Sequence, residues 1–496
     1  MANIRRQSIK GTIWVYTGFA IGAFITFLFT YKSWFSPLEY GLTRSILDIG
    51  SLVFVFSCFG STFYLYKFFP YYKDNLPSKQ NDLLGLAIKI STIGFIIVVA
   101  MLYLLEPNII RKFSAKSLLL VQYFYLTIPA GFFMLMYGLL EAYSYGFSKG
   151  VTTNFIKETA MRLFTLIIVL LKVFAVINFT IFINLFALQF AIATILLAWV
   201  LYKEDSLWIS FKTSRVTKKF KKNIINIVSL TFLTQIVSVL RISIDTLVLA
   251  SKQDLAKVAI FGFITYLVMM MQAPIRSVSA ITIPILSRYW KEKNLYEIGR
   301  IYKRSSINLL TYSVFIFCFI LLNFTPVIQF LNLNEVYLEG KMVFILLGVT
   351  TILELGTGVN AQIIGTSSFF RFELWTSILL TALIIPLSYF LTVKYGILGP
   401  AAANLLSFAI YNFIRFAFLY RKFNMQPFSS KTLEVLIIAA IGFLITHYVF
   451  AGYVGVVFII FRAFLFSILF ITPVFFRNIS PDFKPVVDAL KKRVGK

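Results

Sequence analysis

Apolar runs of about twenty residues recur along the whole of this 496-residue sequence, and this recurrence limits its possible folds more than any other feature. Hydrophobic residues make up 59% of the chain and charged residues only 14%, whereas a soluble domain is about a quarter charged. One water-soluble core cannot hide so many apolar side chains. Each run has the length that an α-helix needs to cross a bilayer, and its backbone must satisfy its own hydrogen bonds there.

The runs therefore predict an all-α integral membrane protein with about 14 transmembrane helices. They are continuous and do not alternate polar with apolar residues, which argues against a transmembrane β-barrel. The first run is long for a signal peptide, and no small-x-small cleavage site follows it, so we interpret it as a retained span. The predicted spans are 11–31, 46–69, 82–105, 117–140, 153–176, 179–202, 224–250, 257–285, 306–325, 341–364, 371–393, 397–420, 432–451 and 454–476.

The net charge of +27 comes from basic residues that lie in short clusters between the apolar runs. They form no single basic face or arm, so the charge gives no reason to expect a nucleic-acid partner. The clusters fall in alternate loops, as the positive-inside rule requires, and this predicts a multi-pass plasma-membrane protein with both termini cytoplasmic. The most basic loop, 203–223, is predicted to be a cytoplasmic linker on the anionic inner leaflet. A docking site for a partner protein is the alternative interpretation of this loop.

A short internal similarity predicts how the spans are grouped. The stretches that begin at Gly150 and Gly365 resemble each other, and each opens the penultimate span of a six-span block. Duplicated halves of this kind are common in transporters. We expect two six-helix lobes joined by the basic linker and followed by two further helices. The predicted boundaries are 1–202 for the first lobe, 203–223 for the linker, 224–422 for the second lobe, and 423–496 for spans 13–14 with a basic cytoplasmic tail.

The sequence offers no constellation for a metal, a cofactor or an enzyme active site. The two cysteines, Cys58 and Cys318, lie inside apolar runs and are predicted to be packing residues. His447 is the single histidine, and nothing resembles a nucleotide-binding loop. We therefore expect a transporter and not an enzyme.

Three stretches carry a resemblance to a known family. They are "SPLEYGLTRSILDIGSL" (36–52), "IDTLVLASKQDLAKVAIFGF" (244–263) and "KYGILGPAAANLLSF" (394–408). With the span count, they resemble the Wzx-type polysaccharide biosynthesis flippases of the multidrug/oligosaccharidyl-lipid/polysaccharide exporter superfamily. Gly41, Gly396 and Gly399 in these stretches are predicted to allow tight turns between closely packed spans, so they mark the family and not a site.

The resemblance implies a V-shaped cavity between the two lobes, alternating access, and a bacterial inner membrane. It implies that the protein moves a lipid-linked oligosaccharide, usually on undecaprenyl diphosphate, from the inner to the outer leaflet. The product would be a surface polysaccharide such as O-antigen or capsule. Membrane lipids and the polysaccharide assembly machinery would be its partners.

Charged residues inside spans are the candidate site, because such groups are costly in lipid and usually face a cavity or a partner. Arg241, Arg276 and Lys172 are the predicted cations for the diphosphate, since a guanidinium binds two phosphate oxygens at once. Together they would form a clamp between the lobes. Two alternatives stay open: Lys172 can extend outward from the span end, and Asp245, one helical turn from Arg241, can neutralise it.

Glu354 is the predicted coupling carboxylate, because a carboxyl group inside a span can take up a proton and couple transport to the proton gradient. It can equally form an ion pair with Arg276 or another cation. Gly356 and Gly358 follow it and predict close helix approach or local unwinding. Six other charged residues lie near span ends and can extend toward the membrane surface: Asp48, Lys89, Glu158, Arg162, Glu373 and Arg415.

Two other functions compete with this prediction. A cation-coupled multidrug exporter of the same superfamily usually carries carboxylates inside its first lobe, whereas here the first span has no charge between Lys10 and Lys32. That difference favours an anionic cargo. A membrane glycosyltransferase or polymerase would have a large outer loop with acidic catalytic residues. The longest predicted outer loop, about 323–340, contains only Glu335 and Glu339 as acidic residues.

Overall fold

The computed structural model describes residues 2–480, and these residues form helices and no β-strands. The all-α prediction is therefore confirmed for the described part of the chain. Eleven helices there are long and apolar enough to cross a membrane, or twelve if α9 (Phe179–Ala187) and α10 (Gln189–Lys203), which bend by 41°, form one span. Residues Thr17–Thr30 make a shorter apolar helix. The full count of fourteen stays a prediction.

The chain divides into two compact units, residues 1–259 and 260–496. The division falls within α12 (Leu255–Lys291), so α11 (Arg215–Lys252) belongs to the first unit. There it packs on two earlier helices, α2 (Pro37–Cys58) and α3 (Ser61–Asn75). The predicted six-helix lobes rest on the sequence similarity and remain a prediction.

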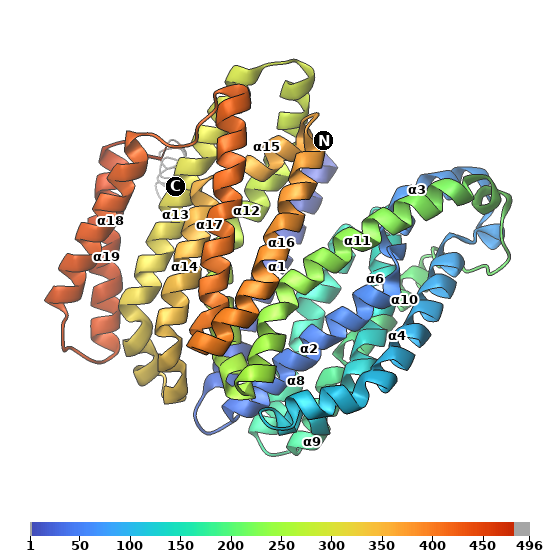
Figure 1. Cartoon of the computed structure of the whole chain (residues 1–496), viewed down its shortest axis with the longest axis horizontal. Coiled ribbons are helices and arrows are strands. Elements are labelled where there is room, and N and C mark those ends of the chain that lie inside the picture. The colour runs from blue at the N-terminus through green and yellow to red at the C-terminus, as the bar shows by residue number, and fades with distance from the viewer. Residues whose placement is uncertain (1, 481–496) are drawn as a thin grey trace. The chain divides into compact units, whose positions relative to one another are not determined.

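The first unit is built around α2, which contacts α4, α6 and α11 (Figure 1). Buried aromatic and aliphatic side chains from these helices, among them Tyr64, Tyr72 and Tyr143, form its core. The predicted span 153–176 consists of two α-helices and a π-helical segment between them. The remaining elements of this unit are α1 (Ala2–Thr30), η1 (Ser78–Gln80), α4 (Leu83–Phe113), α5 (Leu118–Gln122), η2 (Phe124–Leu126), α6 (Thr127–Gly146), α7 (Gly150–Asn154), the π-helical η3 (Phe155–Ala160) and α8 (Met161–Val173).

Helix α2 starts at Pro37, although the apolar run predicted a span over 46–69. Ser36 caps the helix by accepting a hydrogen bond from the Glu39 amide, and the Glu39 carboxylate accepts one from the Ser36 amide. Proline at the first helical position reinforces this start. The helix ends where Phe59 and Gly60 adopt left-handed backbone conformations. The predicted span therefore missed the first turns of α2 and ran across its end.

The predicted linker 203–223 is folded in part. Its last nine residues, 215–223, are the first turns of α11. Before them, the Ser214 amide donates to a carboxylate oxygen of the buried Asp82 at 2.9 Å, and the Thr217 hydroxyl donates to the same oxygen at 2.7 Å. These bonds fix the start of α11 against the start of α4.

Two of the family-marking glycines act in different ways. Gly396 has a φ of 59° and makes the turn between α16 (Phe370–Tyr395) and α17 (Leu398–Phe423), as predicted. Gly41 lies inside α2, so the prediction of a turn there was wrong. A Cβ on Gly41 would lie 1.8 Å from the Leu255 carbonyl oxygen, and the residue instead permits close approach to the start of α12.

In the second unit, α13, α14, α16 and α17 pack in neighbouring pairs, and the α18–α19 hairpin packs on α13 (Figure 1). Phe315, Phe466 and Phe470 join the hairpin to α13. Arg462 of α19 is buried and donates to the carbonyls of Phe450 and Tyr453 in the hairpin turn, at 2.8 and 2.6 Å. The bounds not yet given are α13 (Leu295–Phe330), η4 (Glu335–Glu339), α14 (Gly340–Gly356), α15 (Asn360–Thr366), α18 (Ser430–Val449) and α19 (Val456–Phe476).

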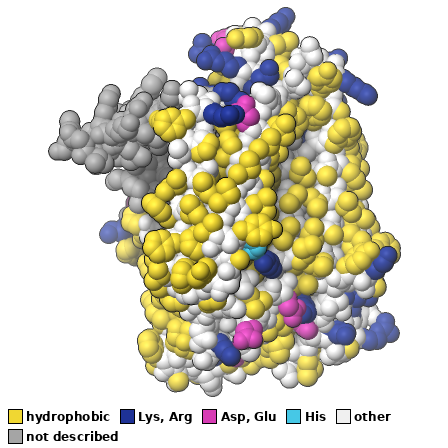
Figure 2. Space-filling model, turned by 90° about the vertical axis from the view of Figure 1, so that its left-hand side faces the viewer, with side chains coloured by type: hydrophobic (Ala, Val, Ile, Leu, Met, Phe, Trp, Pro, Cys, Tyr) yellow, Lys and Arg dark blue, Asp and Glu magenta, His cyan; other side chains and the backbone are white. Residues whose placement is uncertain are grey.

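The face that carries α18 and α19 has the surface expected of a membrane protein. Hydrophobic side chains cover most of it, and lysine and arginine side chains gather toward its ends (Figure 2). Exposed apolar residues such as Leu433, Ile460 and Phe464 lie on these helices. With the number of span-length helices, this surface indicates a multi-pass membrane protein. Cys58 and Cys318 are unbridged and buried, which confirms that they pack in the interior.

Candidate functional site: charged side chains within the spans

Helices α2 and α11 run antiparallel, and three contacts define their register. A Cβ on Gly41 would lie 1.8 Å from the carbonyl oxygen of Leu255, which is three residues after the end of α11. The Ser243 hydroxyl donates to the Asp48 carbonyl at 3.4 Å. At the other end, a Cβ on Gly60 would lie 2.5 Å from the Val228 carbonyl oxygen. This register brings the middle of α2 opposite the second half of α11.

Four charged residues lie on these two helices at that level, and we call them the α2–α11 charge cluster. Arg44 and Asp48 belong to α2, and Arg241 and Asp245 belong to α11. Asp245 is only 7% exposed. The Asp48 carboxyl group interacts with Arg44 and with the side chain of Thr246. Equal numbers of cations and anions thus lie within segments that are otherwise apolar.

Arg241 lies deep in its span. It is eleven residues from Lys252, where α11 ends, which corresponds to about 16 Å along the helix. A hydrocarbon core is about 30 Å thick, so this position is close to its middle. Arg241 is partly buried, and no ion pair joins it to Asp245 or to any other carboxylate in residues 2–480. Neutralisation of Arg241 by Asp245 across one helical turn stays an alternative.

Lys172 lies at the end of α8, beside the connection between α1 and α2. Its ammonium group donates to the Trp34 carbonyl, lies 3.9 Å from the Glu39 carboxylate, and stacks 4.4 Å from the centre of the Phe35 ring. These contacts place it at the end of its span, in line with the alternative that it extends outward. Its predicted role as a cation for the cargo stays a proposal.

The other two predicted site residues belong to the second unit. Arg276 is an exposed residue of α12 and lies fifteen positions before the end of that helix at Lys291. Glu354 is partly buried, two residues before the end of α14. The clamp formed by Arg241, Arg276 and Lys172 remains a proposal.

The second unit contains a buried arginine that the sequence did not identify as such. Arg415 is 2% exposed and forms an ion pair with Glu373. Its guanidinium group also hydrogen-bonds Thr376 and Asn360 and lies 3.8 Å from the centre of the Tyr411 ring. Arg415 can extend to the membrane surface from its place in the sequence, but in the structure it does not, because α16 supplies a carboxylate for it inside the unit.

Hydrogen bonds between polar side chains connect the surroundings of Arg415 with the break between α14 and α15. Thr357 donates to the Asn412 side-chain oxygen at 3.0 Å, and the Asn360 amide reaches both residues. Gly358 has a φ of 62° at the break, which confirms the local unwinding predicted after Glu354. Glu354 lies close enough to Arg415 to act on it electrostatically, so the cation that it faces is not restricted to the predicted Arg276.

The sequence contains a signal for one group of the missed residues and little for the other. The "SPLE" stretch (36–39) is a helix start. It places Arg44, which lies outside the predicted span 46–69, inside α2, and it places Asp48 about three turns into that helix and not near a span end. For Arg415 the signal is weaker. Its partner Glu373 is 42 positions away and on another helix, so hydropathy and spacing could not pair the two residues.

Comparison with known proteins bears on the fold. No protein-family model matches the sequence, and no curated protein matches it either. Among solved structures, the lipid II flippase MurJ in an inward closed conformation matches with a TM-score of 0.75 and 16% identity, covering 95% of this chain and 99% of that one. An inward-facing multidrug resistance MATE transporter of the MOP superfamily matches with a TM-score of 0.60 and 13% identity, over 84% of this chain and 94% of that one.

A third solved structure, the MATE multidrug transporter DinF-BH in complex with R6G, matches with a TM-score of 0.50 and 18% identity, over 85% of this chain and 96% of that one. At these identities the likeness establishes the fold and nothing about cargo. The fold of this chain is therefore similar to the folds of MurJ and of the MATE transporters.

Proposed function

We propose that this protein is a flippase. It moves a lipid-linked oligosaccharide on an undecaprenyl diphosphate carrier from the inner to the outer leaflet of a bacterial inner membrane, by alternating access. The transported unit then serves the synthesis of a surface polysaccharide such as O-antigen or capsule. The proposal needs a place in the membrane interior where a diphosphate is more stable than in hydrocarbon.

The observation that carries this proposal is the environment of Arg241. A guanidinium group near the middle of a span, with no ion-pair partner among the described carboxylates, requires water or an anion from outside the protein. A diphosphate meets that requirement, because each guanidinium can hold two of its oxygens. A lipid II flippase of the same fold supports the choice of a lipid-linked cargo.

Arg276 and Lys172 are proposed to complete the binding of the diphosphate at different stages of the cycle. Asp245 and Glu354 are the proposed carboxylates for ion pairing or coupling to an ion gradient. In this scheme the cargo's acyl chain stays in lipid, and only the charged and sugar-bearing head uses the polar path. The polysaccharide assembly machinery would deliver the head group on the inner side of the membrane and receive it on the outer side. The two units of this protein would pass it between them.

The direct test is a flipping assay in proteoliposomes with a fluorescent undecaprenyl diphosphate-linked oligosaccharide. Arg241→Gln should slow flipping about tenfold to a hundredfold, because it removes charge-assisted hydrogen bonds to phosphate. Lys394→Gln is the matched control, since Lys394 is an exposed cation at the end of α16, and it should flip at the wild-type rate. In cells, Arg276→Ala should abolish surface polysaccharide while the protein still inserts. Wild-type flipping by Arg241→Gln would refute the proposed site.

A cation-coupled multidrug exporter is the second candidate, favoured by the MATE transporters that share the fold. The same proteoliposomes distinguish the two functions. An exporter would accumulate a cationic dye under a proton or sodium gradient, and loss of the Arg241 charge would not weaken the binding of a cation. Dye accumulation without glycolipid flipping would establish the exporter and overturn the flippase.

A further inference from the structure

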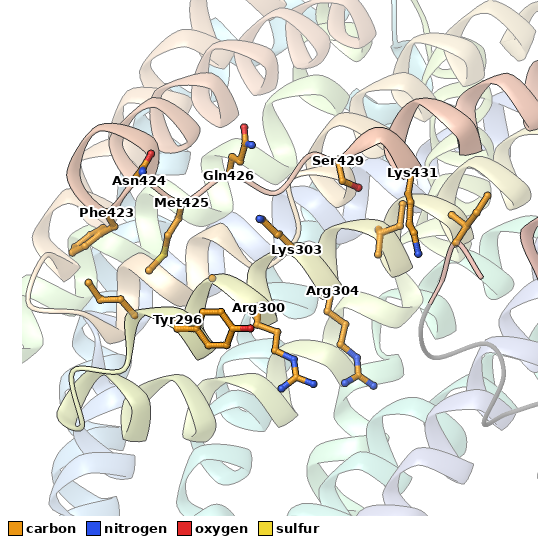
Figure 3. A pocket seen from close by; sticks show the side chains of 14 residues that line it. Tyr296, Arg300, Lys303, Arg304, Phe423, Asn424, Met425, Gln426, Ser429 and Lys431 are labelled. Carbon is orange, nitrogen blue, oxygen red and sulfur yellow. The ribbon is translucent and has the colours of Figure 1, made fainter. Parts of the chain in front are cut away.

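A basic pocket lies at the start of α13, away from the charged residues already described. It has a volume of about 690 Å³ and is bounded by the first turns of α13, by the segment 423–431 that leads from α17 into α18, and by Ile479. Lys303 and Lys431 extend into the space between α13 and this segment, and Arg300 and Arg304 project from α13 one turn apart (Figure 3). A pocket of this size is large enough for a small-molecule group.

The charged side chains among the described residues that line the pocket are all basic. Four cations line it, and the described residues that line it include no carboxylate. Arg300 pairs with Glu297 at 3.3 Å, but its side chain is 62% exposed, so this ion pair is weak. Lys431 donates to the Asn478 carbonyl at 2.6 Å, which positions the ammonium group without neutralising it. A bound anion is therefore stabilised more strongly here than at an ordinary surface position.

The polarity of the lining is divided. Asn424, Gln426 and Ser429 add amide and hydroxyl groups beside the cations, whereas the remaining lining residues include several apolar and aromatic side chains. Ligands with a charged head and an apolar body fit such a lining better than small inorganic ions do. Guanidinium and ammonium groups together are the usual partners of phosphate.

The position along α13 gives the depth of the pocket. The helix runs from Leu295 to Phe330, about 54 Å, which exceeds the hydrocarbon thickness by several turns. Arg304 is two residues before the predicted apolar span 306–325, so the four cations lie at the level of lipid head groups. The basic loops predict that this end of α13 is cytoplasmic, where anionic lipids attract clustered lysine and arginine.

We infer that this pocket binds the phosphate-bearing head group of an anionic phospholipid from the inner leaflet. The lipid would hold the start of α13 against the segment 423–431. The inference uses residues that play no part in the proposed flipping site, so it stands or falls independently of that proposal.

The experiment uses the full-length protein in detergent, stripped of lipid and then titrated with phosphatidylglycerol, with bound lipid counted by native mass spectrometry. The variant R300Q/K303Q/R304Q should bind phosphatidylglycerol about a hundredfold more weakly, because each basic residue near an anionic lipid contributes roughly fivefold. The matched control R111Q/K112Q/K116Q removes three exposed cations at the end of α4 and just after it, and it should bind like the wild type. Equal loss in both variants would show non-specific attraction and overturn the inference.

A second variant separates the cavity from its charge. Gly299 lines the pocket, and a Cβ there would meet only the Met425 side chain, at 3.9 Å. Gly299→Leu should therefore fold, fill the pocket and lower phosphatidylglycerol binding at unchanged net charge. Unchanged binding by this variant would contradict a bound head group in the cavity.

Two further titrations identify the source of the phosphate. Phosphatidylcholine should bind at least tenfold more weakly than phosphatidylglycerol, because its head group carries no net charge. Millimolar inorganic phosphate should leave the bound phosphatidylglycerol in place. Displacement of the lipid by inorganic phosphate, or equal binding of the two lipids, would overturn the proposal of an anionic lipid site.

Discussion

Arg415 and Arg241 are both arginines within apolar helices, but the protein surrounds them differently. Arg415 has a carboxylate, two hydrogen-bonding side chains and an aromatic ring around it. Arg241 is only partly buried and has no ion-pair partner among the described carboxylates. Where the protein supplies the anion itself, the arginine has a structural role. Where it supplies none, we propose that the anion is the cargo.

The largest effect should follow from breaking the Arg415 pair. Arg415→Met removes the ion-pair partner of the partly buried Glu373 carboxylate, and this should lower the free energy of unfolding by about 3–5 kcal/mol. The measurement is titration with a denaturing detergent in mixed micelles, with a fluorogenic maleimide that reports the exposure of Cys58 and Cys318, both of which are buried.

The matched control for this variant is the double replacement Arg415→Met with Glu373→Met. Apolar side chains in place of a buried ion pair often cost little, so most of the lost stability should return. A double variant as unstable as Arg415→Met alone would show that the surrounding hydrogen bonds, and not the ion pair, stabilise this region.

A smaller effect should come from the contact that holds α2 in place near the α2–α11 charge cluster. Gly41→Ala puts a methyl group against the Leu255 carbonyl, where a Cβ would lie at 1.8 Å. The helices must separate, at a cost of about 1–3 kcal/mol in the same unfolding assay. Flipping should also slow, because the register that places Arg241 changes.

Gly299→Ala is the control for Gly41→Ala, since a Cβ at Gly299 has room. It should leave flipping unchanged and raise stability by up to about 1 kcal/mol, because alanine favours a helix more than glycine does. If Gly41→Ala were equally silent, then close packing of α2 on the start of α12 would not determine the position of the charge cluster.

Arg462 provides an intermediate case between the two arginines. It is 6% exposed, but its partners are the backbone carbonyls of Phe450 and Tyr453. Arg462→Met leaves neutral groups in a partly exposed turn, where water can replace the guanidinium. The loss of stability should be about 1–2 kcal/mol, less than for Arg415→Met. A loss as large as that of Arg415→Met would mean that the counter-charge does not explain the difference between these sites.

The sequence predicted these regions to different degrees, for physical reasons. Hydropathy located the apolar helices because lipid imposes length and composition on each span independently. It misplaced the start of α2, because the capping interaction of Ser36 with Glu39 lies outside the apolar run. It could not pair Arg415 with Glu373, since their contact depends on how α16 packs on α17. The deep position of Arg241 was predictable, but its lack of a local partner was not.

The smallest effect on stability should come from Arg241. Arg241→Gln removes a charge that pairs with no described carboxylate, so the free energy of unfolding should change by no more than about 0.5 kcal/mol. It should even rise slightly, because a neutral amide is less costly than a guanidinium inside a span. Arg241→Lys should keep the same stability and restore part of the flipping lost in Arg241→Gln, because lysine retains the charge without the planar fork. A loss of several kcal/mol in Arg241→Gln would instead place Arg241 with Arg415 among the structural arginines. The requirement for an external anion, and with it the main support for an anionic cargo, would then disappear.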